Sequence, residues 1–596
     1  MIQVIEKSTT LGIIGDDSDV RSLVDAFSFN HPQRHMIDTY RLYRMTGGEK
    51  GWDGKLRPFK RTGDGTGAIP RGFRDDVLKA CKQLDIHVDT SKLLTRPFAS
   101  LTPEDIPDDI LTSTFKLDYG QRSAVATWLV NGIGVCHATV SSGKTAMLAA
   151  AAAMIKRSHP DAQFLYITPS ERLVSQTYKE MKKFLPGWDV GKFGGGGPHH
   201  KDAKDMVVCT LAMLNRNFRK LTMEKWWKRF ICILFDESHH ASCASASKVL
   251  NMIPAYFRLG ASDSMKVGDP IKESTIKGLL GPIRFHIDAK PLIQVGRLAQ
   301  PWIYVVDNLE WNNTHKGLGH RADIGSQAWV QLAGIPDPIS GIYRGNVYNR
   351  TEAGDLKTAK RKILGTNVDT GAPEFQDVEE PIIIPGFHVI EIDGAEYQVE
   401  SKWCLIQRTY DQAIINFQPR NDLVCEWAKY FSDQGKQTLI VATRTWHTRI
   451  LETMMSKVVD PKLVRVLTSE NTMREKDDTF DWVRKTPGCV LVSSLVKEGV
   501  SINELRAGII ADVVADHEVG NQVLGRFMRR KEVDNYAEIV WFFDRQNASL
   551  RKACQRFFRG INQIKGYFFV YPVVHPQDVV SARTYDTTSI IEGHRA

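Results

Sequence analysis

The feature that most constrains the fold is a regular alternation of short apolar β-type runs with longer helical patterns. The alternation extends from residue 111 to about 305 and returns from about 403 to 575. Parallel strands need a crossover segment between them, and that segment is usually a helix. The sequence therefore predicts an α/β fold with two doubly wound parallel-sheet lobes. The clearest β-type runs are 163–168, 206–210, 231–235, 438–442, 489–493 and 539–543.

Three further segments surround these lobes. Residues 1–110 form a small α+β module, which a Pro/Asp-rich linker at 102–109 closes off. Residues 306–402 break the rhythm with Gly, Pro and isolated β runs, and Asp393-Gly394 predicts a hairpin turn within 390–397. We expect a mostly β insertion between the lobes and a loosely held C-terminal tail over 576–596.

Composition limits the partners and the cellular setting. The net charge of +9 favours a polyanionic partner. Nine cysteines without a CxxC pair argue against a zinc ribbon or a disulfide framework, so we expect a cytoplasmic location. The most apolar stretch, Ala146 to Ile155, is half as long as a bilayer span, and no signal peptide is recognisable. We expect no membrane association.

A phosphate-binding loop is predicted between a β-type run and an alanine-rich helix, at residues 138–145. Backbone N–H groups of Ser141, Ser142 and Gly143 would hold the phosphates of ATP, and Lys144 would reach the β- and γ-phosphates. Thr145 would be a ligand of Mg²⁺. Ser141 stands where a glycine is usual.

Two adjacent carboxylates follow an apolar run some ninety residues later. Asp236 ends this run and is predicted to hold Mg²⁺, while Glu237 would orient and deprotonate the attacking water. An ordinary strand end with surface acids is the alternative. The spacing from the phosphate-binding loop favours the catalytic interpretation.

The second lobe offers arginines that could act on the same nucleotide. Gln522, Arg526 and Arg529 lie in one helical pattern, and we expect the two arginines on one face as arginine fingers. A solvated basic helix is the competing interpretation. Ahead of the phosphate-binding loop, the amide of Gln121 could read the adenine edge.

In this order the motifs resemble those of superfamily-2 helicases, which implies two RecA-like lobes. The resemblance places an additional nucleotide contact at Gly499. It also implies sequence-independent DNA contacts at Pro169, Ser170, Arg172, Thr210, Thr443, Arg444 and Ser494. Asp263 departs from the family pattern, which has a small residue there.

Residues 51–57 and 69–73, with the glycines at 194–197, resemble the UvsW-type recombination helicases of T-even-like phages. That resemblance implies a DNA-dependent ATPase that remodels forks and junctions in recombination or repair, with recombination or replication proteins as possible partners. A monomer in the cytoplasm of the phage's host is expected. Seven Lys or Arg stand against two acids over 41–61, so Lys55 and Arg57 are predicted to contact duplex phosphates.

Two alternatives remain open from sequence. An RNA helicase would share most of these motifs, although Ser238-His239 follows the paired acids in place of the ending typical of many RNA helicases. A hydrolysis-weak DNA clamp is suggested by Ser141 and Asp263. The adjacent His239 and His240 are expected to point apart, and no metal site beyond Mg²⁺ is predicted.

Overall fold

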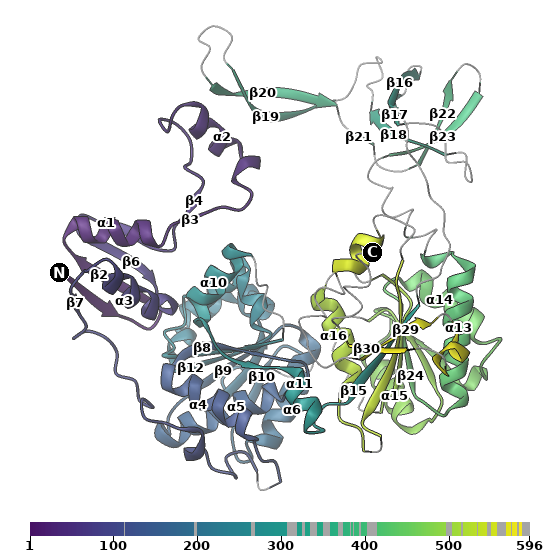
Figure 1. Ribbon diagram of the computed structural model, residues 1–596. Helices are drawn as coiled ribbons and strands as arrows, with labels where there is room; N and C mark the ends of the chain where they lie inside the picture. The colour runs from purple at the N-terminus through teal and green to yellow at the C-terminus, as the bar shows by residue number, and fades with distance from the viewer. Residues whose placement is uncertain are drawn as a thin grey trace. The chain divides into compact units, whose positions relative to one another are not determined.

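The computed structural model forms two compact units, Met1–Arg34 with Gly54–Val295 and His35–Asp53 with Gly296–Ala596 (Figure 1). The structure describes residues 1–112, 114–195, 199–263, 269–306, 319–324, 328–333, 342–349, 358–366, 373–381, 383–384, 387–392, 395–401, 410, 414–495, 504–513, 517–532, 534–544, 550–556, 568–573, 575–580 and 583–586. Within this described part, no helix is both long and apolar enough to cross a membrane.

The main sheet of the first unit has seven strands in the order β10-β11-β9-β12-β13-β8-β14, and every neighbouring pair is parallel. Its strands are β8 (Ile133–Ala138), β9 (Phe164–Thr168), β10 (Val190–Phe193), β11 (Met206–Thr210), β12 (Cys232–Asp236), β13 (Phe257–Ser262) and β14 (Ile283–Ile287). Its helices are α4 (Tyr119–Asn131), α5 (Lys144–Ser158), α6 (Glu171–Phe184), α7 (Leu211–Arg216), α8 (Phe218–Met223), α9 (Ala244–Leu250), α10 (Pro270–Leu280) and α11 (Ala289–Gln294).

The side chains of this sheet and its helices form two clusters of buried apolar residues. Strands covered on both faces carry continuous apolar runs, because neither face meets water. The alanine-rich stretch is part of α5, and Ala146 to Ile155 are all buried. Its apolar character therefore reflects a central core helix.

The second unit contains an eight-stranded sheet in the order β25-β26-β24-β27-β28-β15-β29-β30. All its neighbouring pairs are parallel except β29 with β30, which confirms the predicted α/β class for both lobes. Its strands are β15 (Gln300–Val306), β24 (Thr438–Val441), β25 (Val464–Leu467), β26 (Val490–Ser493), β27 (Ala507–Ile510), β28 (Tyr536–Phe542), β29 (Phe568–Val573) and β30 (Arg583–Asp586). Its helices are α13 (Gln418–Asp433), α14 (Thr445–Met455), α15 (Met473–Lys485) and α16 (His517–Phe527).

Two expected boundaries are wrong in this sheet. Strand β15 lies between β28 and β29, so residues from 300 onward belong to the second lobe and not to the first. The β-rich insertion consequently leaves from inside the second lobe. Strand β30 pairs with β29, so part of the expected tail is an edge strand of the sheet. The sheet partners of β15 and β30 could not be predicted from where these strands lie in the sequence.

The described parts of the insertion are all β-strand. They form a six-stranded sheet and a separate β19–β20 pair. The predicted hairpin is present as β22 and β23, with Ile392 opposite Ala395, while Asp393 and Gly394 lie outside the described residues. The strands are β16 (Gly319–Ile324), β17 (Ala328–Ala333), β18 (Ile342–Asn349), β19 (Thr358–Thr366), β20 (Pro373–Pro381), β21 (Ile383–Ile384), β22 (Phe387–Ile392) and β23 (Ala395–Ser401).

The N-terminal module has a five-stranded sheet in the order β5-β6-β2-β1-β7, with its own apolar core. Residues 35–53, which contain α2 (Asp38–Met45), belong instead to the second unit. The other elements are β1 (Ile2–Glu6), β2 (Thr10–Gly15), α1 (Asp17–Ala26), β3 (Phe29–Asn30), β4 (Lys55–Leu56), β5 (Lys60–Gly63), β6 (Thr66–Pro70), α3 (Arg74–Gln83) and β7 (Val88–Asp89).

A buried ion pair docks this module onto the first lobe. Arg71 Nε lies 2.7 Å from Glu6 Oε1, and their side chains are 1% and 0% exposed. Arg71 also donates to the backbone carbonyl of Tyr256, which precedes β13, and its guanidinium lies 4.4 Å from the Tyr256 ring centre. The module is therefore packed against the lobe, and the linker at 102–109 does not make it a free appendage.

Close backbone packing strengthens this docking. A Cβ added to Gly72 would lie 1.7 Å from the carbonyl oxygen of Lys277 in α10, so only glycine fits there. Lys277 also pairs with Asp76 at 2.7 Å. The module and α10 are therefore closely packed against each other.

Replacing Arg71 with alanine should destabilise the protein by about 3 kcal/mol, because the buried carboxylate of Glu6 loses its main partner. Thermal or chemical unfolding of the first unit measures this change. Arg21→Ala is the matched control, since Arg21 pairs with Asp17 at the surface, where such pairs contribute about 0.5 kcal/mol. Equal stability of the two variants would contradict the docking role.

Candidate active site

The phosphate-binding loop joins β8 to α5 with two left-handed backbone positions. Gly143 has φ 87°, and a Cβ there would lie 2.4 Å from Gln121 Nε2. Ser141 has φ 62°, so this serine adopts the conformation that the usual glycine takes without strain. The loop therefore turns into the start of α5 with a serine in a left-handed conformation.

Lys144 begins α5 and lies against three acids. Its Nζ is 3.3 Å from Glu237 Oε1 and 4.0 Å from Asp263 Oδ2. Asp236 ends β12, and Glu237 follows it with a left-handed φ of 50°. Strands β8, β12 and β13 are neighbours in register, so their carboxyl ends bring the lysine and the acids to one edge of the sheet. The predicted Lys144, Asp236 and Glu237 are thus brought together.

Burial and charge together shift the titration of these groups. Burial raises the pKa of Glu237 to about 8, and the charges of Asp263 and Asp236 add to this while Lys144 opposes it. The pKa of Asp236 is also raised, chiefly by burial. For Lys144, burial alone would lower the pKa, but the carboxylates of Asp263, Glu237 and Asp236 outweigh it and raise it. The lysine therefore stays charged.

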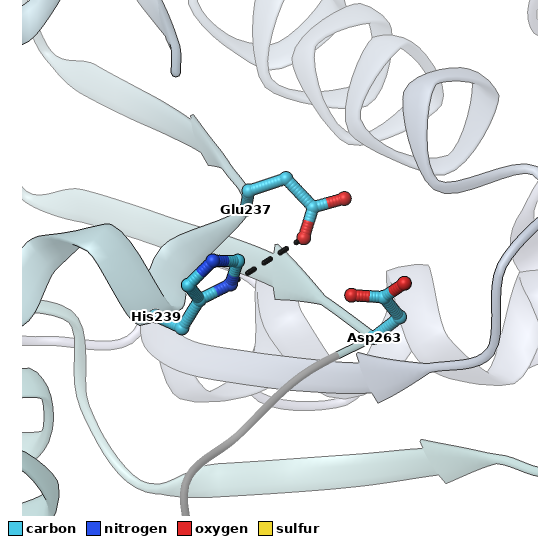
Figure 2. Close-up of side chains that lie close together, drawn as sticks. All are labelled: Glu237, His239 and Asp263. Atoms are coloured by element: carbon cyan, nitrogen blue, oxygen red, sulfur yellow. Dashed lines mark ion pairs between the residues drawn. The ribbon is translucent and has the colours of Figure 1, made fainter. Parts of the chain in front are cut away.

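A hydrogen-bond chain that the sequence did not reveal orients Glu237. Ser262 Oγ donates to Glu237 Oε2 at 3.3 Å, so the His239 Nδ1, 2.9 Å from Ser262 Oγ, must donate to it. Figure 2 shows Glu237 and His239, which follow β12, near Asp263, which follows β13. His239 and His240 do not point apart, since their ring centres are 4.1 Å apart within a 3₁₀ turn.

The donor set fits Mg²⁺ and a phosphate. Thr145 and Asp236 offer hydroxyl and carboxylate oxygens, the ligands that Mg²⁺ prefers. The Ser142 hydroxyl is buried and finds no hydrogen-bond partner among the described residues, as expected for a group that awaits a phosphate oxygen. Glu237, His239 and Asp263 also place ligand atoms within 4.8 Å of one another, but the ammonium of Lys144 already compensates their charge.

Gln121 contacts the phosphate-binding loop directly. Its Nε2 donates to the Ser142 carbonyl at 2.8 Å, and its Oε1 accepts from the Asp118 N–H at 3.1 Å. Both ends of the amide are therefore engaged within the lobe in this conformation. Adenine recognition by Gln121 stays a prediction, and it requires these bonds to exchange.

The predicted DNA contacts of the first lobe gather at one sheet edge. Strands β9 and β11 are parallel neighbours with Thr168 opposite Thr210. Pro169 and Ser170 follow the end of β9, and Thr210 is the last residue of β11. Ser170 and Thr210 both cap helices, with their hydroxyls accepting from the N–H groups of Leu173 and Met213. Thr210 is buried, Pro169 is exposed, and Arg172 is half-buried.

In the second lobe, Thr443 and Ser494 follow the parallel neighbours β24 and β26. Thr443 and Arg444 are exposed at the start of α14. Gly499 lies outside the described residues. The described residues among the predicted DNA contacts lie at or just after strand ends in both lobes. Their contacts with DNA stay predictions.

The helical placement of Arg529 is wrong. Helix α16 ends at Phe527, and Arg529 forms a β-bridge with Leu298. The Ala299 N–H donates to the Met528 carbonyl at 2.8 Å, so pairing with the segment before β15 straightens the chain. Gln522 and Arg526 do share one face of α16. Arg526 is 8% exposed, and its Nη1 donates to the Leu495 carbonyl at 3.2 Å.

Comparisons with known proteins agree with this nucleotide site. Residues 114–262 match the family described as "Type III restriction enzyme, res subunit". Over 155 residues the chain is 28% identical to the DExH-box ATP-dependent RNA helicase DExH15, chloroplastic, of Arabidopsis thaliana, covering 26% of this chain and 13% of that protein. Over 189 residues it is 23% identical to the DNA 3'-5' translocase XPB2 of Sulfurisphaera tokodaii, covering 32% and 40%.

The chain therefore spans well under half the length of these two curated relatives. Among solved structures, that of T4 UvsW aligns with a TM-score of 0.40 at 15% identity, covering 95% of this chain and 98% of that chain. The matched range includes both the phosphate-binding loop and the paired acids. Site and family match therefore agree on a candidate nucleotide-binding lobe within residues 114–262.

Proposed function

We propose that the protein is an ATP-driven superfamily-2 translocase that acts on DNA, with branched DNA as its preferred substrate. The observation that carries the ATPase part is the ion pair of Lys144 with Glu237 at the phosphate-binding loop. A phosphate competes with Glu237 for the Lys144 ammonium. Once Lys144 turns to the phosphates, Glu237 is available to hold and deprotonate a water. Bound Mg²⁺ would compensate phosphate charge through Asp236 and Thr145.

A nucleic acid as the polymer is supported by two observations. The net charge is +9, and Lys55, Arg57 and Lys60 are exposed on the N-terminal module, with Lys60 in its edge strand β5. A docked module that holds duplex would convert stepping by the lobes into fork regression or branch migration. Recombination or repair is the cellular process that this chemistry would serve.

The deciding experiment measures ATP turnover with single-stranded, duplex, forked and four-way DNA and with RNA of matched sequence. Greatest stimulation by forked or four-way DNA is expected. Greatest stimulation by RNA would favour the RNA helicase alternative. Binding without turnover on every polymer would favour the clamp.

The basic edge of the module provides a prediction on substrate choice. Lys55, Arg57 and Lys60 are exposed. Arg61, which pairs with Asp17, is left unchanged. Changing the three residues to glutamine should remove the preference for junctions. A plot of the logarithm of the duplex-binding constant against the logarithm of salt concentration should also become less steep. Its slope should fall in magnitude by up to about 2.7, because each lost phosphate contact contributes about 0.9. Basal ATP turnover should persist.

A triple change of Lys79, Lys82 and Lys92 to glutamine is the matched control. These lysines are exposed on the same module, so the change in net charge is identical. Junction and linear-duplex affinities of both variants are compared at two salt concentrations. If both variants lose affinity equally, only net charge matters and the assigned edge is wrong.

A further inference from the structure

A buried polar cluster lies beneath the loop that begins α14. His447 and Asp512 are both 0% exposed, and His447 Nδ1 is 2.7 Å from Asp512 Oδ1. His447 Nε2 is 3.0 Å from the side-chain oxygen of Asn421. Asn421 in turn donates through Nδ2 to the Ile415 carbonyl at 2.8 Å. That last bond fixes the amide orientation, so the oxygen of Asn421 faces the imidazole.

Both ring nitrogens of His447 have partners in this cluster. Nδ1 faces the Asp512 carboxylate, and Nε2 faces the Asn421 side-chain oxygen. Burial alone would raise the pKa of Asp512, but the hydrogen bonds from His447 and Thr443 hold it below its ordinary value.

The same carboxylate holds the exposed loop. Asp512 Oδ2 accepts the backbone N–H of Thr443, while Oδ1 accepts from His447. Arg420 donates to the carbonyl of Ala511 at 2.7 Å, which anchors the chain next to Asp512. The position of Thr443 is thereby tied to the end of β27 through one buried side chain.

The held loop presents two groups that suit a phosphate. Thr443 and Arg444 are exposed, and the Thr443 hydroxyl is 3.0 Å from Tyr410 Oη. The Arg444 guanidinium lies 5.6 Å from the Tyr410 ring centre. A hydroxyl beside a guanidinium can bind a nucleic-acid phosphate without reading sequence.

We propose that His447 and Asp512 are positioning residues that hold Thr443 and Arg444 against a phosphate of the bound nucleic-acid strand. This inference rests on the proposed function, because it presupposes that the second lobe binds nucleic acid. A buried ion pair contributes little stability compared with apolar residues of equal volume. The pair therefore acts by holding the loop that carries Thr443 and Arg444 in position.

The test uses the full chain with a labelled oligothymidylate and fluorescence anisotropy. His447→Gln should weaken binding about tenfold, the loss that one charge-assisted contact supports. In a Thr443→Val/Arg444→Gln background, His447→Gln should lower the affinity for the oligonucleotide less than about twofold, because His447 acts through those residues. Affinity for ATP at the first lobe, measured with a fluorescent analogue, should not change.

His575→Gln is the matched control, since His575 pairs with Glu426 at 2.8 Å on the surface of the same unit, where their side chains are 45% and 39% exposed. It should bind the oligonucleotide like wild type. An equal loss from His447→Gln in both backgrounds would mean a general effect on the lobe and overturn the proposal. The proposal would also be overturned if His447→Gln binds like wild type while the Thr443→Val/Arg444→Gln variant binds more weakly.

Failure of the proposed function looks different, because it shows in the wild-type protein: either the oligonucleotide does not bind, or it binds without stimulating ATP turnover. If His447→Gln does not fold, Asp512→Asn is tested in the same two backgrounds. Asparagine retains an acceptor for the Thr443 N–H but removes the charge that pairs with His447. The same dependence on Thr443 and Arg444 is expected, and equal losses in both backgrounds overturn the proposal.

Discussion

Arg526→Ala should lower ATP turnover at saturating ATP and nucleic acid about a thousandfold, the effect of losing an arginine finger. That factor corresponds to about 4 kcal/mol of transition-state stabilisation. Arg526 lies on the buried side of α16, and its Nη1 donates to the Leu495 carbonyl at 3.2 Å. The guanidinium is therefore held in one place within the second lobe.

Turnover and nucleotide affinity are measured on the same Arg526→Ala preparation. Arg551→Ala is the control, because Arg551 is exposed on a basic helical face of the same unit. It should turn over ATP like wild type. If Arg526→Ala changes nucleic-acid affinity alone, and turnover of the bound complex is normal, Arg526 is a nucleic-acid contact. Arg529 lies beyond α16, so Arg529→Ala should have the smaller effect on turnover.

Glu237→Gln should slow ATP hydrolysis at least about a hundredfold while ATP still binds, because the amide cannot accept the proton of the attacking water. The Ser262 hydroxyl can still donate to the amide oxygen of the substituted side chain, so the local hydrogen bonding is largely retained. Lys144 loses a competing negative charge 3.3 Å away, and we therefore expect unchanged or tighter ATP binding. Single-turnover hydrolysis and equilibrium nucleotide binding measure the two effects separately.

Lys144→Ala provides the contrasting variant, since it should impair both binding and hydrolysis. Glu224→Gln is the control for the amide substitution, because Glu224 is exposed on the same lobe and pairs with Lys201. Near-normal hydrolysis by Glu237→Gln would remove Glu237 from the role of base. Asp263, the third acid near Lys144, would then be the residue to test.

The local chemistry of the site is readable from sequence because it depends on short spacings. A β-type run followed by Gly143-Lys144-Thr145 predicts a strand, a phosphate-binding loop and a helix, and the structure has β8, the loop and α5 in that order. The paired acids at the end of an apolar run likewise lie at the end of β12. Parallel α/β pairing then brings these ends to one sheet edge, so the fold class and the core of the site follow from the pattern.

Contacts between residues far apart in the sequence were decided by the tertiary structure alone. Strand β15 joins the second sheet because its backbone pairs with β28, more than two hundred residues later, and no local pattern specifies that partner. The hydrogen bonds from His239 through Ser262 to Glu237 likewise join the ends of β12 and β13. The pair of His447 with Asp512 joins α14 to the segment after β27. Sequence spacing fixes which residues share a strand or a helix, whereas strand order fixes which strand ends meet. That order depends on the burial of whole sheets, which is why these contacts appear only in the folded chain.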